Sequence, residues 1–219
     1  METYARERTA LLFVDPYNDF LSEGGKMWPQ LQRVAEEVGL HENLRRLLAA
    51  VRARGIQVVV VPHRRFAPGD LARWARPTPY QRGAADILIF GQGTWGGEWH
   101  PDFAPQPGDL VAKEHWGSSG FSNTDLDVLL RQRDVTHLIL VGLIANTCIE
   151  CTGRFASELG YHVTLVRDAT AAFSPEAMRA AHDVNGPAFA HVVTTTGELL
   201  DALAGDRDRL PTPPRRQRP

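Results

Sequence analysis

Six short apolar runs recur along the chain, and stretches with helical patterning separate them. The runs are nearly continuous and rich in β-branched residues, which is typical of strands buried on both faces of a parallel sheet. They lie at residues 10–14, 56–61, 110–112, 137–141, 162–166 and 189–193. An apolar stretch at 86–90 predicts one further, short strand.

The stretches between the runs have the apolar spacing of amphipathic helices. Residues 42–54, for example, carry Leu44, Leu47, Leu48 and Val51 at the i, i+3, i+4, i+7 spacing. The sequence predicts helices at 42–54, 124–133, 147–159, 176–183 and 197–204. Strands that alternate with helices in this way predict a doubly wound α/β fold with a mainly parallel sheet.

One domain accounts for nearly the whole chain. The sequence has no repeat of fixed period and no internal linker, so we expect a single domain over residues 1–205. Residues 62–109 are rich in proline, glycine and tryptophan and are long for a connection without structure, so we expect them to shape a site or an interface. The tail at 206–219 is rich in proline and arginine and is expected to be disordered.

Composition excludes several classes of protein. Of 219 residues, 43% are hydrophobic and 23% are charged, as in ordinary globular domains. With 24 basic and 26 acidic residues the formal charge is −2, so no positive field favours nucleic acid or an anionic membrane. No run approaches the roughly 18 apolar residues of a membrane span, and the first residues lack a signal-peptide pattern. We expect a cytoplasmic protein with no nucleic-acid or membrane partner.

Three reactive side chains follow predicted strands, at the sheet edge where open α/β folds bind ligands. Asp15 follows the first run, Lys113 follows the third, and Cys148 begins the helix after the fourth. Taken singly, they are typical of a turn aspartate, a surface lysine and a buried, inert thiol. Together they indicate catalysis, because a helix N-terminus and an ammonium lower the pKa of a thiol and a carboxylate can carry its proton. Cys151, one turn further, is assigned to packing.

The motifs around these residues resemble the isochorismatase-like cysteine hydrolases. The likeness covers about residues 8–204, with the motifs in the family's order. It rests on Val-Asp-Pro-Tyr-Asn-Asp-Phe at 14–20, Lys113 before Ser-Gly-Phe at 119–121, Gly-Leu-Ile-Ala-Asn-Thr-Cys at 142–148, and the segments 151–156, 160–163 and 168–170. The resemblance implies a six-stranded parallel sheet with helices on both faces, which agrees with the fold read from the apolar runs.

The resemblance also implies a catalytic triad of Cys148, Asp15 and Lys113. Cys148 would attack a carbonyl as thiolate, Asp15 would act as general base and then acid, and Lys113 would stabilise the charged pair. The family has a cis peptide bond that corresponds to Leu143–Ile144 here. The N–H groups of Ile144 and Cys148 would then form the oxyanion hole.

Two departures from family patterns narrow the function. Nicotinamidases of this family carry an Asp-x-His metal motif after the second strand, whereas this chain has only His63 there, so we predict no catalytic metal and no cofactor. Isochorismatases proper can lack the cysteine, so its presence favours C–N hydrolysis of a small amide, cyclic amide or ureide through a thioester. Two alternatives stay open. One is vinyl-ether hydrolysis with Asp15 as acid, and the other is a catalytically inactive binding or scaffold protein on this fold.

Aromatic residues near the motifs are candidates for a substrate pocket or an oligomer interface. The pocket candidates are Tyr17, Phe20, Trp28, Trp95, Trp99, His115, Trp116 and Phe173. Residues 91–96 match the dinucleotide motif G-x-G-x-x-G, but the proline-rich segment that follows cannot open the helix that this motif requires. We therefore expect a small-molecule substrate and a homo-oligomer, a dimer or a tetramer as in other family members.

Overall fold

Six strands form one sheet in the order β3-β2-β1-β4-β5-β6, and every neighbouring pair is parallel. The computed structural model describes residues 4–205, so the disorder expected for 206–219 lies outside the described residues. The strands are β1 (Thr9–Val14), β2 (Gln57–Val61), β3 (Leu110–Val111), β4 (His137–Leu143), β5 (His162–Ala171) and β6 (Val192–Thr194). The predicted six-stranded, doubly wound α/β fold is confirmed.

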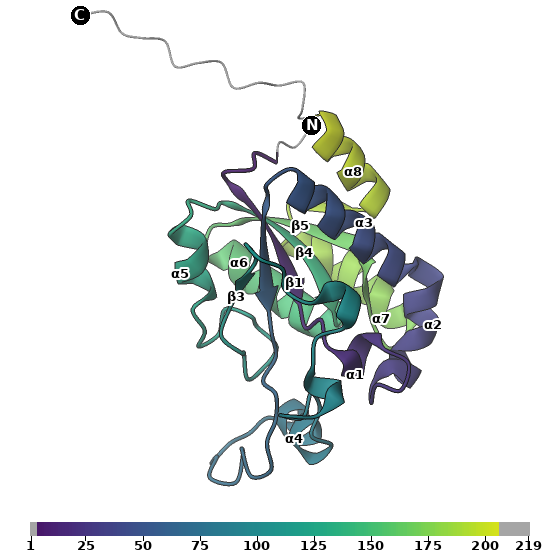
Figure 1. Ribbon diagram of the computed structural model, residues 1–219, viewed down its shortest axis with the longest axis vertical. Coiled ribbons are helices and arrows are strands. Elements are labelled where there is room, and N and C mark those ends of the chain that lie inside the picture. Colours follow the sequence, from purple (N-terminus) through teal and green to yellow (C-terminus); the bar gives the residue numbers. More distant parts are fainter. Residues whose placement is uncertain (1–3, 206–219) are drawn as a thin grey trace, which may run out of the picture.

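Helices cover both faces of this sheet, as Figure 1 shows. The α-helices are α1 (Asn18–Leu21), α2 (Trp28–Val38), α3 (Leu40–Ala53), α4 (Pro79–Asp86), α5 (Leu126–Arg131), α6 (Glu150–Glu158), α7 (Pro175–Arg179) and α8 (Thr196–Gly205). Along β1, Leu11 and Phe13 pack into the core that includes α2, α3 and α8, whereas Leu12 and Val14 pack into the core that includes α5 and α6. The uninterrupted apolar run of β1 is explained by these two cores, because both of its faces are buried.

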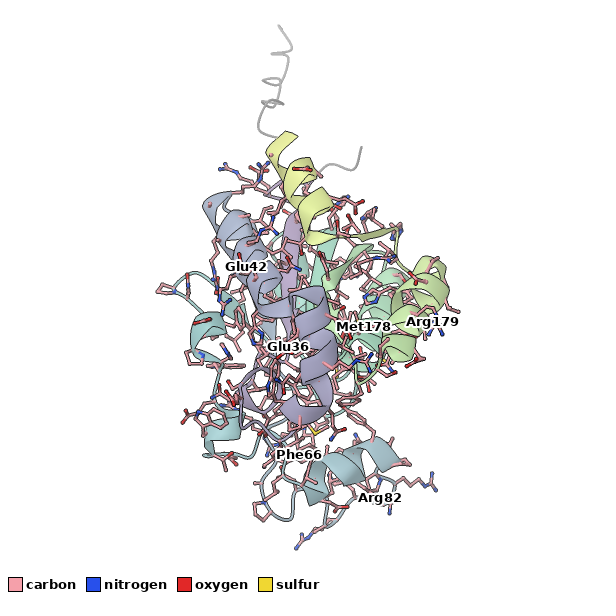
Figure 2. All side chains as sticks on the ribbon, turned by 90° about the vertical axis from the view of Figure 1, so that its right-hand side faces the viewer. Glu36, Glu42, Phe66, Arg82, Met178 and Arg179 are labelled. Carbon is pink, nitrogen blue, oxygen red and sulfur yellow. The ribbon has the colours of Figure 1, made fainter. Side chains whose placement is uncertain are left out.

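The segment 62–109 differs most from the sequence-based expectation. The short strand predicted at 86–90 is wrong. This stretch contains the end of α4 and a turn in which Leu88 and Phe90 have positive φ angles of 48° and 50°. The helix α4 starts at a capping box in which Thr78 and Gln81 bond each other's backbone N–H groups. Figure 2 shows α4 at the lower end of the molecule, with Arg82 pointing away from the fold and Phe66 where the helix meets it.

Element boundaries also differ elsewhere. The helix predicted at 147–159 is a π-helical turn, Ala145–Ile149, followed by α6. The strand predicted at 189–193 forms only as β6, because a 3-10 turn over Gly186–Ala188 precedes it and Phe189 packs against Gly153 of α6. Helix α2 was not predicted, although Leu31, Val34 and Ala35 form its buried stripe. Within residues 4–205, no helix is long and apolar enough to cross a membrane.

Strand order reverses at β1, which creates the crevice where doubly wound sheets bind ligands. From β1 the chain builds the sheet outward on one side through β2 and β3, and on the other side through β4, β5 and β6. At the carboxyl ends of the paired strands β1 and β4, Gly142 has φ +109°, and a Cβ there would collide with the backbone of Val14. Glycine at 142 therefore lets β4 approach β1 at the point where Asp15 leaves the sheet.

Candidate active site

Three side chains meet at the carboxyl ends of β1, β3 and β4, and they differ from the expected trio in one member. A carboxylate oxygen of Asp15, a ring nitrogen of His115 and the sulfur of Cys148 all lie within 4.8 Å of one another. Each of the three residues is 0% exposed. We call these residues the trio. The sequence had assigned His115 only to the aromatic pocket, and Lys113 to this position.

Asp15 is the first residue after β1, and its backbone is in the left-handed region with φ +55°. Aspartate tolerates this conformation better than most residues, although it is a sparsely populated one that tends to mark functional sites. Its N–H donates to the carbonyl of Val61 on β2 over 3.1 Å. Its Oδ1 lies 3.1 Å from His115 Nε2, whereas Oδ2 is buried and hydrogen-bonds to no nitrogen or oxygen of the described residues.

The expectation that the Lys113 ammonium lies beside the thiol is not met, because the Lys113 side chain is exposed. Its backbone N–H, rather than its ammonium, is tied to a carboxylate, that of Asp125, over 2.7 Å. The cause is an extra residue after β3. The N–H of Ala112 donates to Val60, but the next bond along the strand, to Pro62, comes from His115. Two residues on one strand thus oppose three on the other, which is a bulge that turns His115 toward Asp15.

Hydrogen bonding fixes the number of protons on the pair of His115 and Asp15. The Nδ1 of His115 lies 2.7 Å from the carbonyl oxygen of Gly117, and a carbonyl can only accept, so Nδ1 carries a proton. The Nε2 faces Asp15, and a hydrogen bond there needs one more proton between the two groups. These bonds place two protons on the pair, one on Nδ1 and one shared between Nε2 and Asp15, so the pair as a whole is neutral. His115 thus takes the place beside Asp15 that the family resemblance had assigned to Lys113.

Cys148 lies within the π-helical turn that follows β4, and it is fully buried. Burial raises the pKa of the Cys148 thiol well above its usual value, and the nearby Asp15 carboxylate raises it further. The sequence had predicted the opposite direction from the helix N-terminus and a nearby ammonium, without the cost of removing a thiolate from water. The resting thiol therefore keeps its proton, and attack on a substrate requires a base. The Leu143–Ile144 peptide bond before this turn is cis, as the resemblance implied.

Two residues beside the trio were missed as pocket residues by the sequence reading. The hydroxyl of Tyr80, on α4, lies 3.8 Å from Cys148 Sγ. The ring of His63, after β2, lies edge-on to the ring of His115 with centroids 4.9 Å apart. Burial lowers the pKa of His63 to about 4, so its ring is neutral. The Thr78–Gln81 capping pattern could have predicted the start of α4. No pattern in the sequence predicts that Tyr80 contacts Cys148.

The remaining pocket candidates divide into three groups. Tyr17, Phe20 and Trp28 are core residues: Tyr17 and Phe20 pack on Phe90, and Trp28 packs on His41. Trp95 and Phe173 are 50% and 41% exposed. Trp99 stacks on Tyr17, and the backbone carbonyl of Trp116 accepts a hydrogen bond from Gln81 on α4. Trp116 is therefore the candidate most directly tied to the helix that carries Tyr80.

The trio is closed to solvent. A surface groove of 470 Å³ lies between α2 and α7, where Figure 2 labels Met178 and Arg179, and no trio residue lines it. The Tyr80 hydroxyl on α4 lies 3.8 Å from the sulfur, although 37% of Tyr80 is exposed, and Ala84 is the only buried residue of that helix.

The trio also consists of atoms of the types that zinc takes in proteins, one carboxylate oxygen, one imidazole nitrogen and one sulfur. The trio supplies three ligand atoms, and zinc binding would have to displace the proton of the thiol and the proton between His115 and Asp15. The same residues can act in proton transfer without a metal. A metal-independent reaction stays a prediction.

Comparison with known proteins identifies relatives over nearly the whole chain. The model of the isochorismatase domain matches residues 9–197. The ureidoacrylate amidohydrolase RutB of Enterobacter sp. strain 638 is 29% identical over 216 residues, covering 92% of each chain. A cysteine hydrolase structure from Pseudomonas syringae pv. phaseolicola 1448A has a TM-score of 0.78 at 27% identity, covering 94% of this chain and 96% of its own. The N-carbamoylsarcosine amidase of Thermoplasma acidophilum has a TM-score of 0.64 at 27% identity, covering 86% and 96%.

Proposed function

The chain belongs to the isochorismatase family, and we propose that it is a cysteine hydrolase that cleaves a C–N bond of a small amide, cyclic amide or ureide. The observation that carries this proposal is the cluster of Asp15, His115 and Cys148, buried at the carboxyl edge of the sheet. A thiol beside a carboxylate suits acyl transfer, in which one group attacks and the other moves the proton. The amidohydrolases among the relatives support the same reaction class.

The first half of the reaction forms a thioester on Cys148. Asp15 takes the thiol proton while the sulfur attacks the carbonyl carbon, so the S–C bond forms and the carbonyl electrons move to oxygen. The N–H groups of Ile144 and Cys148 receive this oxyanion, as in the family that the chain belongs to. The C–N bond then breaks, and the leaving nitrogen takes the proton from Asp15.

The second half releases the acid. Asp15 takes a proton from water as the water oxygen attacks the thioester carbonyl. The S–C bond breaks, and the sulfur recovers its proton from Asp15. Throughout, His115 holds Asp15 Oδ1 and leaves Oδ2 for the proton that moves. With the shared proton on its Nε2, His115 carries a positive charge that stabilises the thiolate formed during attack.

The substrate class follows from the relatives and the closed site. One relative is named for ureidoacrylate and a structural neighbour for N-carbamoylsarcosine, and both names denote compounds with a carbamoyl group on nitrogen. The aromatic rings of Tyr80 and His63 beside the trio suit a small, flat group. The substrate is therefore a small molecule that binds beside Tyr80.

A substrate panel tests the proposal. Purified enzyme is incubated with ureidoacrylate, N-carbamoylsarcosine, simple primary amides and cyclic imides, and released ammonia or amine is measured. We expect turnover of at least one member and none by Cys148→Ala. No release from any member would refute the proposal. Isochorismate forms a separate arm, in which cleavage by Cys148→Ala would support vinyl-ether hydrolysis instead.

Two further properties belong to the same proposal. We expect the protein to act in the cytoplasm, and to form a dimer or tetramer through the aromatic part of 62–109. Light scattering of the purified chain gives its mass directly. A mass of 24.3 kDa, that of one chain, would contradict the oligomer.

A further inference from the structure

His63 is a buried histidine that the mechanism does not use. It follows β2, is 1% exposed, and its ring lies among Phe66, Tyr80, Phe90 and His115. Two of these neighbours, Tyr80 and His115, themselves contact Cys148 or Asp15. The ring is thus one side chain removed from the reacting atoms.

The hydrogen bonds of His63 determine its tautomer. Its Nδ1 lies 3.1 Å from the carbonyl oxygen of Arg64, which can only accept, so Nδ1 carries the proton. Because the buried ring is neutral, its Nε2 is then a bare acceptor. This Nε2 is fully buried and has no hydrogen-bond partner among the described residues. Buried polar atoms without partners are uncommon and costly, so such an atom beside an active site calls for a donor from the substrate.

We propose that His63 Nε2 accepts a hydrogen bond from an N–H group of the substrate, so that the enzyme selects amides and ureides that keep at least one N–H on the carbonyl. This inference rests on the proposed function and narrows its substrate class. A substrate without N–H, such as an ester or a fully alkylated amide, leaves the acceptor unpaired in a dry site. A site built around a hydrogen bond rejects an analogue that lacks it, because the unpaired group bears the full cost.

The ordinary alternative is that His63 only fills space among aromatic rings. A variant with a ring of similar size and no acceptor distinguishes packing from hydrogen bonding, because it keeps the packing and removes the lone pair of Nε2. His63→Phe is that variant. His63→Gln is its matched control, since the side-chain carbonyl of glutamine restores an acceptor at similar reach.

The test uses two alkylating probes and a single thiol. Cys148 and Cys151 are the only cysteines, so a Cys151→Ala background leaves Cys148 alone. Chloroacetamide carries N–H groups and methyl chloroacetate carries none. In both reactions the sulfur displaces chloride, so an S–C bond forms, a C–Cl bond breaks, and the thiol proton passes through Asp15 to solvent. Intact mass gives each rate, and division by the rate with glutathione removes intrinsic reactivity.

We expect the amide-to-ester ratio to fall about tenfold in His63→Phe, the loss that corresponds to one hydrogen bond. The ratio should be kept in His63→Gln. Equal ratios in the Cys151→Ala background and in His63→Phe would overturn the inference. If His63→Phe does not fold, N-methyl and N,N-dimethyl chloroacetamide are compared on the background protein. The larger drop should come with loss of the last N–H, and no such step would overturn the inference.

These outcomes separate the inference from the proposed function. If no panel amide is hydrolysed but the preference for the amide probe depends on His63, the proposed activity fails. The inference that His63 accepts a hydrogen bond from an amide N–H then still stands. If amides are hydrolysed and the preference is the same in His63→Phe, the activity stands and only this inference fails.

Discussion

Replacing His115 by glutamine removes the one side chain of the trio that can carry a positive charge and keeps a hydrogen-bond donor. The change therefore tests charge rather than contact. The matched control is Lys113→Gln, which alters the lysine that the family resemblance places in the triad and that is exposed here. A third variant, His115→Lys, returns an ammonium to the buried position.

The expected loss follows from the distance between His115 and the charge that develops on the sulfur. A ring nitrogen of His115 and the sulfur of Cys148 lie within 4.8 Å of each other, and both residues are 0% exposed. Unit charges of opposite sign at this distance attract by roughly 3.5 kcal/mol at an effective dielectric constant of about 20. Loss of this attraction slows the attack by about 10²- to 10³-fold.

The assay is kcat/KM on the best amide of the panel, with thermal melting to verify folding. We expect His115→Gln to lose about two to three orders of magnitude, Lys113→Gln to stay near wild type, and His115→Lys to recover part of the loss. The reasoning is refuted if Lys113→Gln abolishes activity while His115→Gln retains it, because the triad would then contain the lysine after all.

Three other changes test separate parts of the structure. Because the pKa of His63 falls from an ordinary 6.5 to about 4 on folding, the unfolded chain binds more protons between these values. The free energy of unfolding should then drop by roughly 3 kcal/mol as pH falls from 6.5 to 4. Urea titrations at several pH values should show a weaker dependence of this free energy on pH in His63→Phe. Tyr80→Ala should uncover Cys148 and speed its alkylation by iodoacetamide by about tenfold or more, equivalent to about 1.4 kcal/mol. Tyr80→Phe should not, and equal rates in the two variants would show that Tyr80 is no barrier. Gly142→Ala, at φ +109° against the backbone of Val14, should cost about 3 kcal/mol or more in urea unfolding. Gly197→Ala in α8 meets nothing within 4 Å and should instead stabilise by about 0.5–1 kcal/mol, so similar effects at both sites would count against the strain.

Much of the fold could be predicted from the sequence because burial on both faces leaves a plain signal. The runs of β1, β2 and β4 are uninterrupted apolar stretches, and the structure places each in the centre of the sheet. The segment 62–109 carried no such signal. Its apolar stretch at 86–90 looked like a strand, but Leu88 and Phe90 adopt left-handed conformations that local pattern does not reveal.

The candidate site could be predicted only where a strand end fixes the residue. Asp15 directly follows the buried strand β1, and Cys148 lies in the turn after the neighbouring strand β4, so sheet geometry brings them together. Lys113 and His115 follow β3, an edge strand of two residues, where one extra residue changes which side chain faces the crevice. A bulge leaves no mark in composition or periodicity. The sequence therefore predicted Lys113 at this position, whereas the structure places the His115 side chain beside Asp15.

The direction of the thiol pKa is a second point that local reasoning missed. The sequence indicated a helix N-terminus at Cys148, which favours a thiolate. Complete burial disfavours the thiolate, and burial is the larger effect here. Asp15 is therefore needed as the base that removes the proton of the Cys148 thiol.

The central claim is that the Cys148 sulfur is the nucleophile of a C–N hydrolase. The most direct measurement compares turnover of the best panel amide by Cys148→Ala and Cys151→Ala, two thiol deletions three residues apart. Cys151 is half-buried, is not part of the trio, and controls for loss of a thiol. The account predicts no turnover by Cys148→Ala and wild-type turnover by Cys151→Ala. Turnover that survives in Cys148→Ala would contradict it.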